Sequence, residues 1–184
     1  MNKLILPILY VLLCMLVYAC EKGRTEEALR RLQKNKISIP YERLVRVASN
    51  DYKKSADDKD FKLVVFIDST ECTSCAIKNM FYWESFLDSV KNKKIRSSFD
   101  IVFIFSPPKA DNERIVYQMR YNDCLRDKVF VDTIGAFTTD NPHIPQEQMY
   151  HTFLLNKNDS VVLVGNPKTY PQIEKMLFRK LTEK

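Results

Sequence analysis

The sequence predicts an α/β fold with a central mixed sheet of about five strands and helices on both faces. Two unbroken apolar runs, at 63–67 and 101–105, are rich in β-branched and aromatic residues, as is typical of strands buried on both faces. Residues 75–91, between these runs, carry apolar side chains at helical spacing. A strand–helix–strand order of this kind predicts a parallel crossover unit. The chain has 184 residues and is 45% hydrophobic, which suffices for one domain with a core.

The first twenty residues predict export. Lys3 provides a positive start, and residues 4–19 are almost entirely apolar, about the length of a signal-peptide core. The segment Val17–Cys20 resembles a bacterial lipobox, with the small Ala19 before the cleavage point. The resemblance implies that 1–19 is a lipoprotein signal peptide and that Cys20 is lipidated; an uncleaved signal anchor is the alternative. Both the lipidated chain and the uncleaved one are expected to be anchored in a membrane, with the domain facing the periplasm or the cell surface. The sequence does not distinguish the inner from the outer membrane.

Residues 20–60 are expected to form an N-terminal stalk or extension after the lipidated Cys20. Thr25 is predicted to be the N-cap of a short helix that ends near Leu32, because acidic residues follow it in the first turn. The polar stretch 36–60 supports no assignment. The compact domain is expected to cover 61–184.

Further elements are expected along this domain. They are a helix over 111–121, a short strand at 129–131, two strands at 151–155 and 160–164 that form a hairpin, and a closing helix over 170–180. In the helix over 111–121, Ile115 and Met119 are expected to face the core. In the closing helix, Ile173, Met176 and Leu177 are expected to do so.

The chemistry is concentrated in one CxxC motif, Cys72 and Cys75, which follows the first buried strand and opens the first long helix. Unpaired N–H groups and the positive end of the helix dipole stabilise a thiolate on Cys72. Cys72 is therefore predicted to be the exposed nucleophile, and Cys75, inside the helix, the less exposed resolving thiol. Outside the cytoplasm such a close pair is expected to be redox-active or disulfide-bonded.

Composition excludes several function classes. The formal net charge is +6, from 29 Lys and Arg against 23 Asp and Glu, and the basic residues are scattered among acidic ones. No basic–aromatic stripe is present, so a nucleic-acid partner is not expected. Three glycines and no Gly-rich phosphate motif argue against nucleotide binding. Two histidines leave little room for a histidine-based metal site, so no metal is expected. Exchange through a cysteine pair requires no bound cofactor, so none is expected.

Residues 61–182 resemble the thioredoxin fold, and in particular the membrane-tethered thiol-disulfide oxidoreductases of the TlpA and ResA kind. More narrowly, the chain resembles thioredoxin-like lipoproteins common in Bacteroidota. The segments that carry the resemblance are Ile67 to Cys75 with Trp83 beyond it, 129–132, and 151–167. The resemblance implies thiol-disulfide exchange with protein thiol or disulfide substrates, and an unidentified redox partner.

Several residues depart from the family pattern around the cysteines. Glu71 stands where thioredoxins usually place Trp, and its negative charge is expected to raise the pKa of Cys72. His151 stands at the family's cis-proline position, directly before Thr152, so these two residues are assigned to substrate binding. The His151 ring is expected beside the sulfurs, where an imidazolium stabilises a thiolate or transfers a proton; a structural histidine is the alternative. Asp68 is a candidate proton acceptor for Cys75.

Two other functions stay open at this point. One is a non-catalytic thioredoxin-fold binding or scaffold lipoprotein whose Cys72–Cys75 bond is structural. The other is a metal carrier that uses these cysteines with a histidine. Cys124 is expected to be a buried core thiol, or else a third redox thiol. The redox direction of the CxxC pair also stays open.

Overall fold

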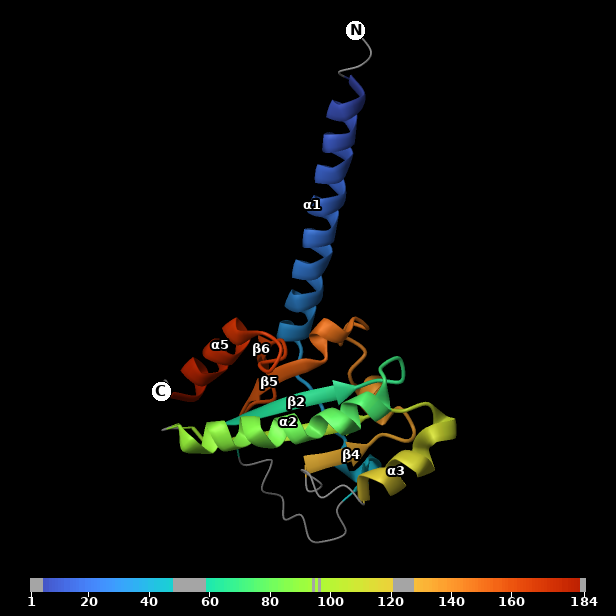
Figure 1. The fold of residues 1–184 in the computed structure, drawn as a ribbon, viewed down its shortest axis with the longest axis vertical. Helices are drawn as coiled ribbons and strands as arrows, with labels where there is room; N and C mark the ends of the chain where they lie inside the picture. The colour runs from blue at the N-terminus through green and yellow to red at the C-terminus, as the bar shows by residue number, and fades with distance from the viewer. Residues whose placement is uncertain (1–4, 48–58, 94, 96, 121–127, 183–184) are drawn as a thin grey trace.

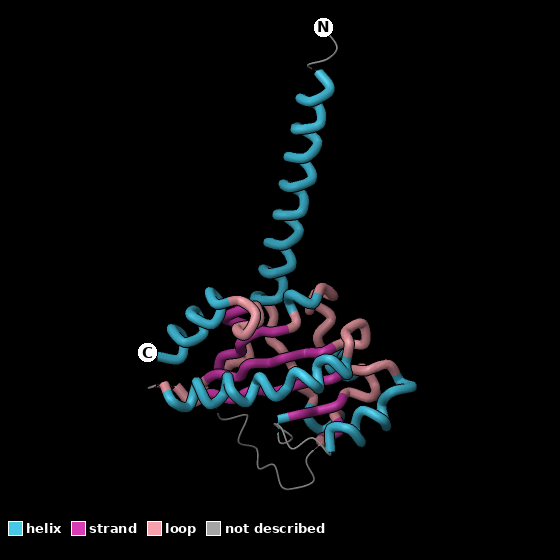
Figure 2. Tube along the Cα trace, viewed as in Figure 1, coloured by secondary structure: helices cyan, strands magenta, loops and turns pink. Residues whose placement is uncertain are grey.

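The computed structural model describes residues 5–47, 59–93, 95, 97–120 and 128–182, and it has a mixed α/β fold built on one six-stranded sheet (Figures 1 and 2). The strands are β1 (Val45–Arg46), β2 (Phe61–Ile67), β3 (Phe99–Phe105), β4 (Val129–Val131), β5 (Thr152–Asn156) and β6 (Val161–Val164). The α-helices are α1 (Ile5–Lys34), α2 (Thr73–Asn92), α3 (Asn112–Arg120), α4 (Ala136–Asp140) and α5 (Pro171–Thr182). Short 3-10 turns precede β1, α3 and β5.

The sheet has the order β1-β4-β3-β2-β5-β6. Strands β2, β3 and β4 are parallel, whereas β1, β5 and β6 are each antiparallel to a neighbour. The predicted crossover is therefore confirmed as β2–α2–β3, and the predicted hairpin as β5–β6, with Asp159 in the left-handed region (φ 58°) at its turn. The sheet has six strands and not five, because the polar stretch after α1 adds β1 at the edge.

Both faces of the sheet are covered, as the unbroken apolar runs predict. Leu63, Val65 and Ile67 of β2 face one core with residues of α2, α3 and α5. Val64 and Phe66 face a second core, which the end of α1 and the short α4 cover. Side chains of a strand alternate between faces, so a central strand between two cores must be apolar at every position.

Part of the predicted N-terminal extension, from the last turns of α1 to β1, packs into the compact domain. Leu32, Ile37 and Leu44 are buried in the second core. The domain therefore begins near the end of α1, earlier than the expected boundary at residue 61. The expected N-cap at Thr25 is wrong, because α1 runs through this residue and its hydroxyl donates to the Glu21 carbonyl one turn earlier (3.0 Å). Among the residues that the structure describes, no helix is both long and apolar enough to span a membrane.

Two details of the closing helices differ from expectation. In α5, Leu177 is fully buried with Phe178 and Leu181, whereas Met176 is 38% exposed, so the prediction that Met176 faces the core is wrong. The buried positions follow the i, i+1, i+4 face of α5 that lies on the sheet. In α3, Ile115 is buried as predicted. Cys124 and the side chain of Met119 lie outside the described residues.

Candidate functional site

Cys72 and Cys75 form a disulfide at the beginning of α2, with their Cα atoms 5.2 Å apart. Cys72 is the N-cap residue, and its Sγ accepts a hydrogen bond from the backbone N–H of Cys75 (3.3 Å). This bond occupies one of the N–H groups that a helix start leaves unpaired. Both cysteines are exposed. Both sulfur-bearing residues are thus accessible, and the prediction that Cys75 is the less exposed of the two stays a prediction.

The disulfide opens onto a cavity of about 780 Å³. Glu71, His151 and Thr152 line this cavity together with both cysteines, so the fold brings these five residues to one place. Exposed Tyr82, Met149 and Tyr170 also line it. This cavity is lined by polar side chains as well as by aromatic and thioether ones, and it is large enough to receive side chains of a polypeptide beside the disulfide.

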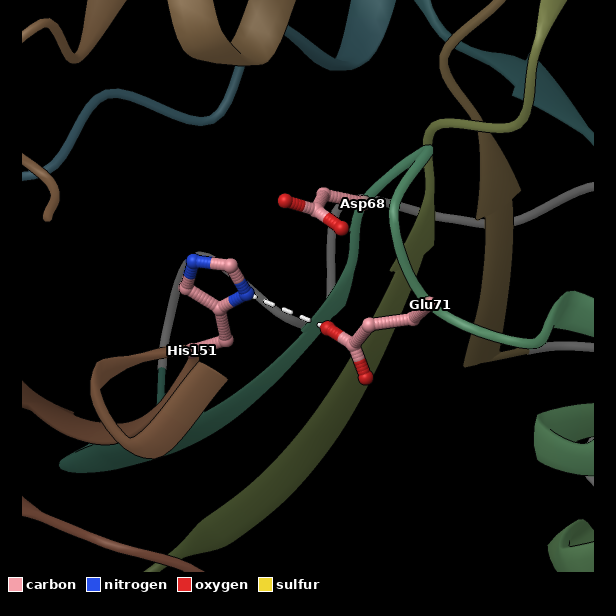
Figure 3. Close-up of side chains that lie close together, drawn as sticks. All are labelled: Asp68, Glu71 and His151. Atoms are coloured by element: carbon pink, nitrogen blue, oxygen red, sulfur yellow. Dashed lines mark hydrogen bonds and ion pairs between the residues drawn. The ribbon is translucent and has the colours of Figure 1, made fainter. Parts of the chain in front are cut away.

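His151 is almost completely buried (3% exposed), and both of its ring nitrogens face oxygen acceptors. Nδ1 lies 3.1 Å from Oε1 of Glu71, a contact that Figure 3 marks with a dashed line. Nε2 lies 3.0 Å from the carbonyl oxygen of Pro145. A neutral imidazole donates from one nitrogen only, so the ring satisfies both contacts as an imidazolium. The ring is therefore engaged with Glu71 and Pro145 through both nitrogens and has no further donor to offer to the sulfurs.

The electrostatics of the site favour the charged ring. Burial by itself lowers the pKa of His151, but the Glu71 hydrogen bond, the Pro145 carbonyl and the charges of Asp68 and Glu71 outweigh it. The net effect raises the pKa of His151 above its ordinary value of 6.5. The aromatic ring of Phe66 packs at 5.0 Å on the same imidazole.

The backbone around His151 explains its position. His151 precedes β5, and its carbonyl accepts from the N–H of Phe66 (2.8 Å), while Thr152 pairs with Val65 in the sheet. No peptide bond within the described residues is cis. His151 therefore stands next to the end of β2, from which the chain continues to Glu71 and the cysteines.

Asp68 lies close to this pair. Its Oδ1 accepts from the backbone N–H (2.8 Å) and the hydroxyl (2.6 Å) of Thr70, which shapes the turn before α2. Potential ligand atoms of Asp68, Glu71 and His151 all lie within 4.8 Å of one another, and Figure 3 shows the three side chains converging. Oxygen and imidazole ligands suit a divalent metal. The hydrogen bond between Glu71 and His151 accounts for the arrangement without one. A role of Asp68 as proton acceptor for Cys75 stays a prediction.

The pairing of Glu71 with His151 is the feature that sequence reasoning missed. Each residue departs visibly from the family pattern, but their separation of 80 residues carries no sign that they meet. The available signal was that both residues depart from the pattern of the family that the sequence resembles, one directly before Cys72 and the other directly before Thr152.

Comparison with known proteins identifies no family. No protein-family model matches the chain, and no curated protein does. A solved structure of a conserved protein of unknown function from Bacteroides fragilis is 17% identical, with a TM-score of 0.46, covering 73% of this chain and 91% of that one. The C-terminal domain of an uncharacterized protein from Bacteroides fragilis NCTC 9343 is 15% identical, with a TM-score of 0.39, covering 67% and 79%. Because both TM-scores are below 0.5, no conclusion rests on either similarity.

Proposed function

We propose that this protein is an exported, membrane-anchored lipoprotein whose thioredoxin-like domain catalyses thiol-disulfide exchange through Cys72 and Cys75. One observation carries the proposal: an exposed disulfide whose first cysteine caps a 20-residue helix, directly after a buried parallel strand and beside an open cavity. The β2–α2–β3 crossover and the β5–β6–α5 segment support a thioredoxin-like domain. No bound cofactor is needed, because the cysteine sulfurs carry the electrons.

The proposed reaction starts from the reduced pair. The Cys72 thiolate attacks one sulfur of a substrate disulfide, which forms a mixed disulfide and releases one substrate thiolate. The Cys75 thiolate then attacks Sγ of Cys72, the mixed disulfide breaks, and the second substrate thiolate leaves and takes up a proton. The substrate disulfide gains two electrons, and the Cys72–Cys75 disulfide of the structure is the oxidised product. The reverse sequence oxidises a substrate dithiol, and a second exchange partner restores the starting state.

A scaffold or binding lipoprotein with a structural disulfide is the second candidate. Glu71 favours it, because a carboxylate directly before Cys72 opposes the helix dipole that activates the thiol. Under this alternative the disulfide only fixes the first turn of α2, and the cavity binds a partner without exchanging electrons.

The reduction potential of the Cys72–Cys75 pair separates these functions. The full-length chain in detergent is equilibrated with glutathione or dithiothreitol buffers, trapped by alkylation and read by peptide mass spectrometry, which distinguishes this pair from the other cysteines. A potential of about −120 to −270 mV, with Cys72 alkylated faster than Cys75, supports an exchange enzyme. A potential well below about −300 mV supports a structural disulfide. Cys75→Ser is expected to trap the mixed disulfide with substrate, and Cys72→Ser is not.

The lipid anchor has its own test. Expression in a bacterial host with radiolabelled palmitate is expected to label the wild-type chain and place it in the membrane fraction. Cys20→Ala removes the sulfur that carries the lipid and is expected to remove the label. Cys14→Ala, within the same apolar segment, is the matched control and is expected to leave labelling unchanged. Labelling of Cys20→Ala would contradict the proposed anchor.

A further inference from the structure

Glu71, an acidic residue, directly precedes the proposed nucleophile Cys72 in the chain. Both residues line the same cavity. A carboxylate near a thiol disfavours the thiolate, and it also opposes the positive end of α2. Within the described residues, Glu71 makes one ion pair, and its partner is His151. The reactivity of Cys72 therefore depends on whether that partner is charged.

We propose that His151 is a positioning residue of the exchange reaction, which binds and neutralises the Glu71 carboxylate so that this charge does not act on the Cys72 thiolate. The inference rests on the proposed exchange function and deepens it. It assigns His151 an indirect action through Glu71, in place of direct contact with the sulfurs.

The surroundings of the ring hold it in the charged form. The groups that face it are the Glu71 carboxylate from the turn before α2, the Asp68 carboxylate from the end of β2, the Pro145 carbonyl and the uncharged Phe66 ring. Within the part of the chain that the structure describes, neither ring nitrogen faces a hydrogen-bond donor. Two carboxylates and a carbonyl around one buried ring favour the imidazolium, whose charge offsets that of Glu71.

The pair also fixes where the Glu71 charge lies. The Glu71 side chain is 22% exposed, and its Oε1 is held at 3.1 Å from Nδ1 of a ring that the sheet and Phe66 immobilise. The carboxylate is thereby directed at His151. Removing His151 leaves a half-buried carboxylate beside the cysteines with no ion-pair partner, where Coulomb interactions are stronger than in water.

The test is a double-mutant cycle on the acidity of the Cys72 thiol. The pH profile of Cys72 alkylation by iodoacetamide is measured in the reduced full-length chain, for wild type, His151→Gln, Glu71→Gln and the double variant. His151→Gln is expected to move the midpoint up by about one pH unit and to slow alkylation about tenfold at neutral pH. Glu71→Gln added to His151→Gln is expected to restore the wild-type midpoint, because the charge is then absent.

A purely structural role of His151 predicts a different cycle. If His151 only packs, the double variant is affected at least as strongly as His151→Gln alone. A double variant whose midpoint is not restored by Glu71→Gln therefore overturns the proposal. An unchanged pH profile in His151→Gln overturns it as well. His143→Gln and Glu147→Gln, which change a histidine and a glutamate that do not line the cavity, are the controls and are expected to keep the wild-type profile.

A second measurement keeps the proposal testable if His151→Gln does not fold. Nitrogen-15 NMR of the imidazole in Glu71→Gln is expected to show His151 titrating at lower pH than in wild type, and no change overturns the ion pair. Exchange with a model peptide disulfide is measured separately. If wild type does not exchange while the cycle behaves as expected, the exchange function fails and the control of Cys72 acidity by the ion pair stands.

Discussion

The carboxylate of Glu71 and the buried imidazole of His151 join two segments that lie 80 residues apart in the chain. Their 3.1 Å contact links the turn before α2 to the residue before β5. Glu71 directly precedes Cys72, and His151 directly precedes Thr152, so the contact lies within the candidate site. The contact thus combines a structural link with control of local charge, and it predicts a distinct pH dependence of stability.

Stability is expected to fall as the pH rises through the pKa of His151. This pKa is raised above 6.5 in the folded protein, so the stabilisation is fully present below the unfolded value and is lost at higher pH. Urea unfolding of the oxidised protein at several pH values from 5 to 9 measures it, and the decline is expected to be smaller in His151→Gln. A decline in stability above pH 6.5 that is as large in His151→Gln as in the wild type would contradict the prediction.

His143 is expected to affect stability only at acidic pH. Burial lowers its pKa, so its contribution to stability is lost as the pH falls below 6.5. His143→Gln is therefore expected to change the stability measured below pH 6.5 and to leave the decline above pH 6.5 as in the wild type.

Leu177→Ala is expected to destabilise the domain by about 2–5 kcal/mol, because it leaves a cavity where a fully buried side chain packs between α5 and the sheet. The adjacent Met176→Ala is the matched control, and its 38% exposed side chain predicts a loss below about 1 kcal/mol. Chemical denaturation of both variants measures the difference. Equal losses would contradict the orientation of α5.

Leu32→Ala is expected to lower the free energy of unfolding by about 2–5 kcal/mol. Leu32 is fully buried in the second core although it lies in the segment before the predicted domain. Gln33→Ala, at the next and exposed position of α1, is expected to change stability by less than about 0.5 kcal/mol. A Leu32→Ala variant as stable as Gln33→Ala would show that the end of α1 does not contribute to the core.

Gly165→Ala is expected to cost about 1–3 kcal/mol. Gly165 follows β6 with φ +123°, and an added Cβ would lie 3.0 Å from Cγ1 of Ile173 in α5. Gly23→Ala in α1 is the matched control, because nothing lies within 4 Å of its added Cβ and alanine favours a helix. Thermal unfolding is expected to show a lower transition temperature for Gly165→Ala only.

Local patterns predicted most of the sheet correctly, for a physical reason. The runs at 63–67 and 101–105 are apolar at every position because both faces of β2 and β3 are buried, and their β-branched and aromatic residues favour a strand over a buried helix. The two-residue strand β1 lies in a polar stretch, whose pattern does not predict a strand. It forms because the edge of β4 is available for antiparallel pairing. Met176 was misplaced because helical spacing allows a shift of the buried face by one position.

The sequence by itself determined where the two cysteines lie: the buried strand β2 and the helix α2 were both predicted from patterns of neighbouring residues, and the CxxC motif between them therefore opens the helix. The tertiary structure alone decided the charge environment of that motif. Antiparallel pairing of β5 with β2 places Thr152 opposite Val65, which carries His151 to the end of β2 and within hydrogen-bond distance of Glu71. That contact depends on strand register across the sheet, and spacing along the chain contains no measure of it.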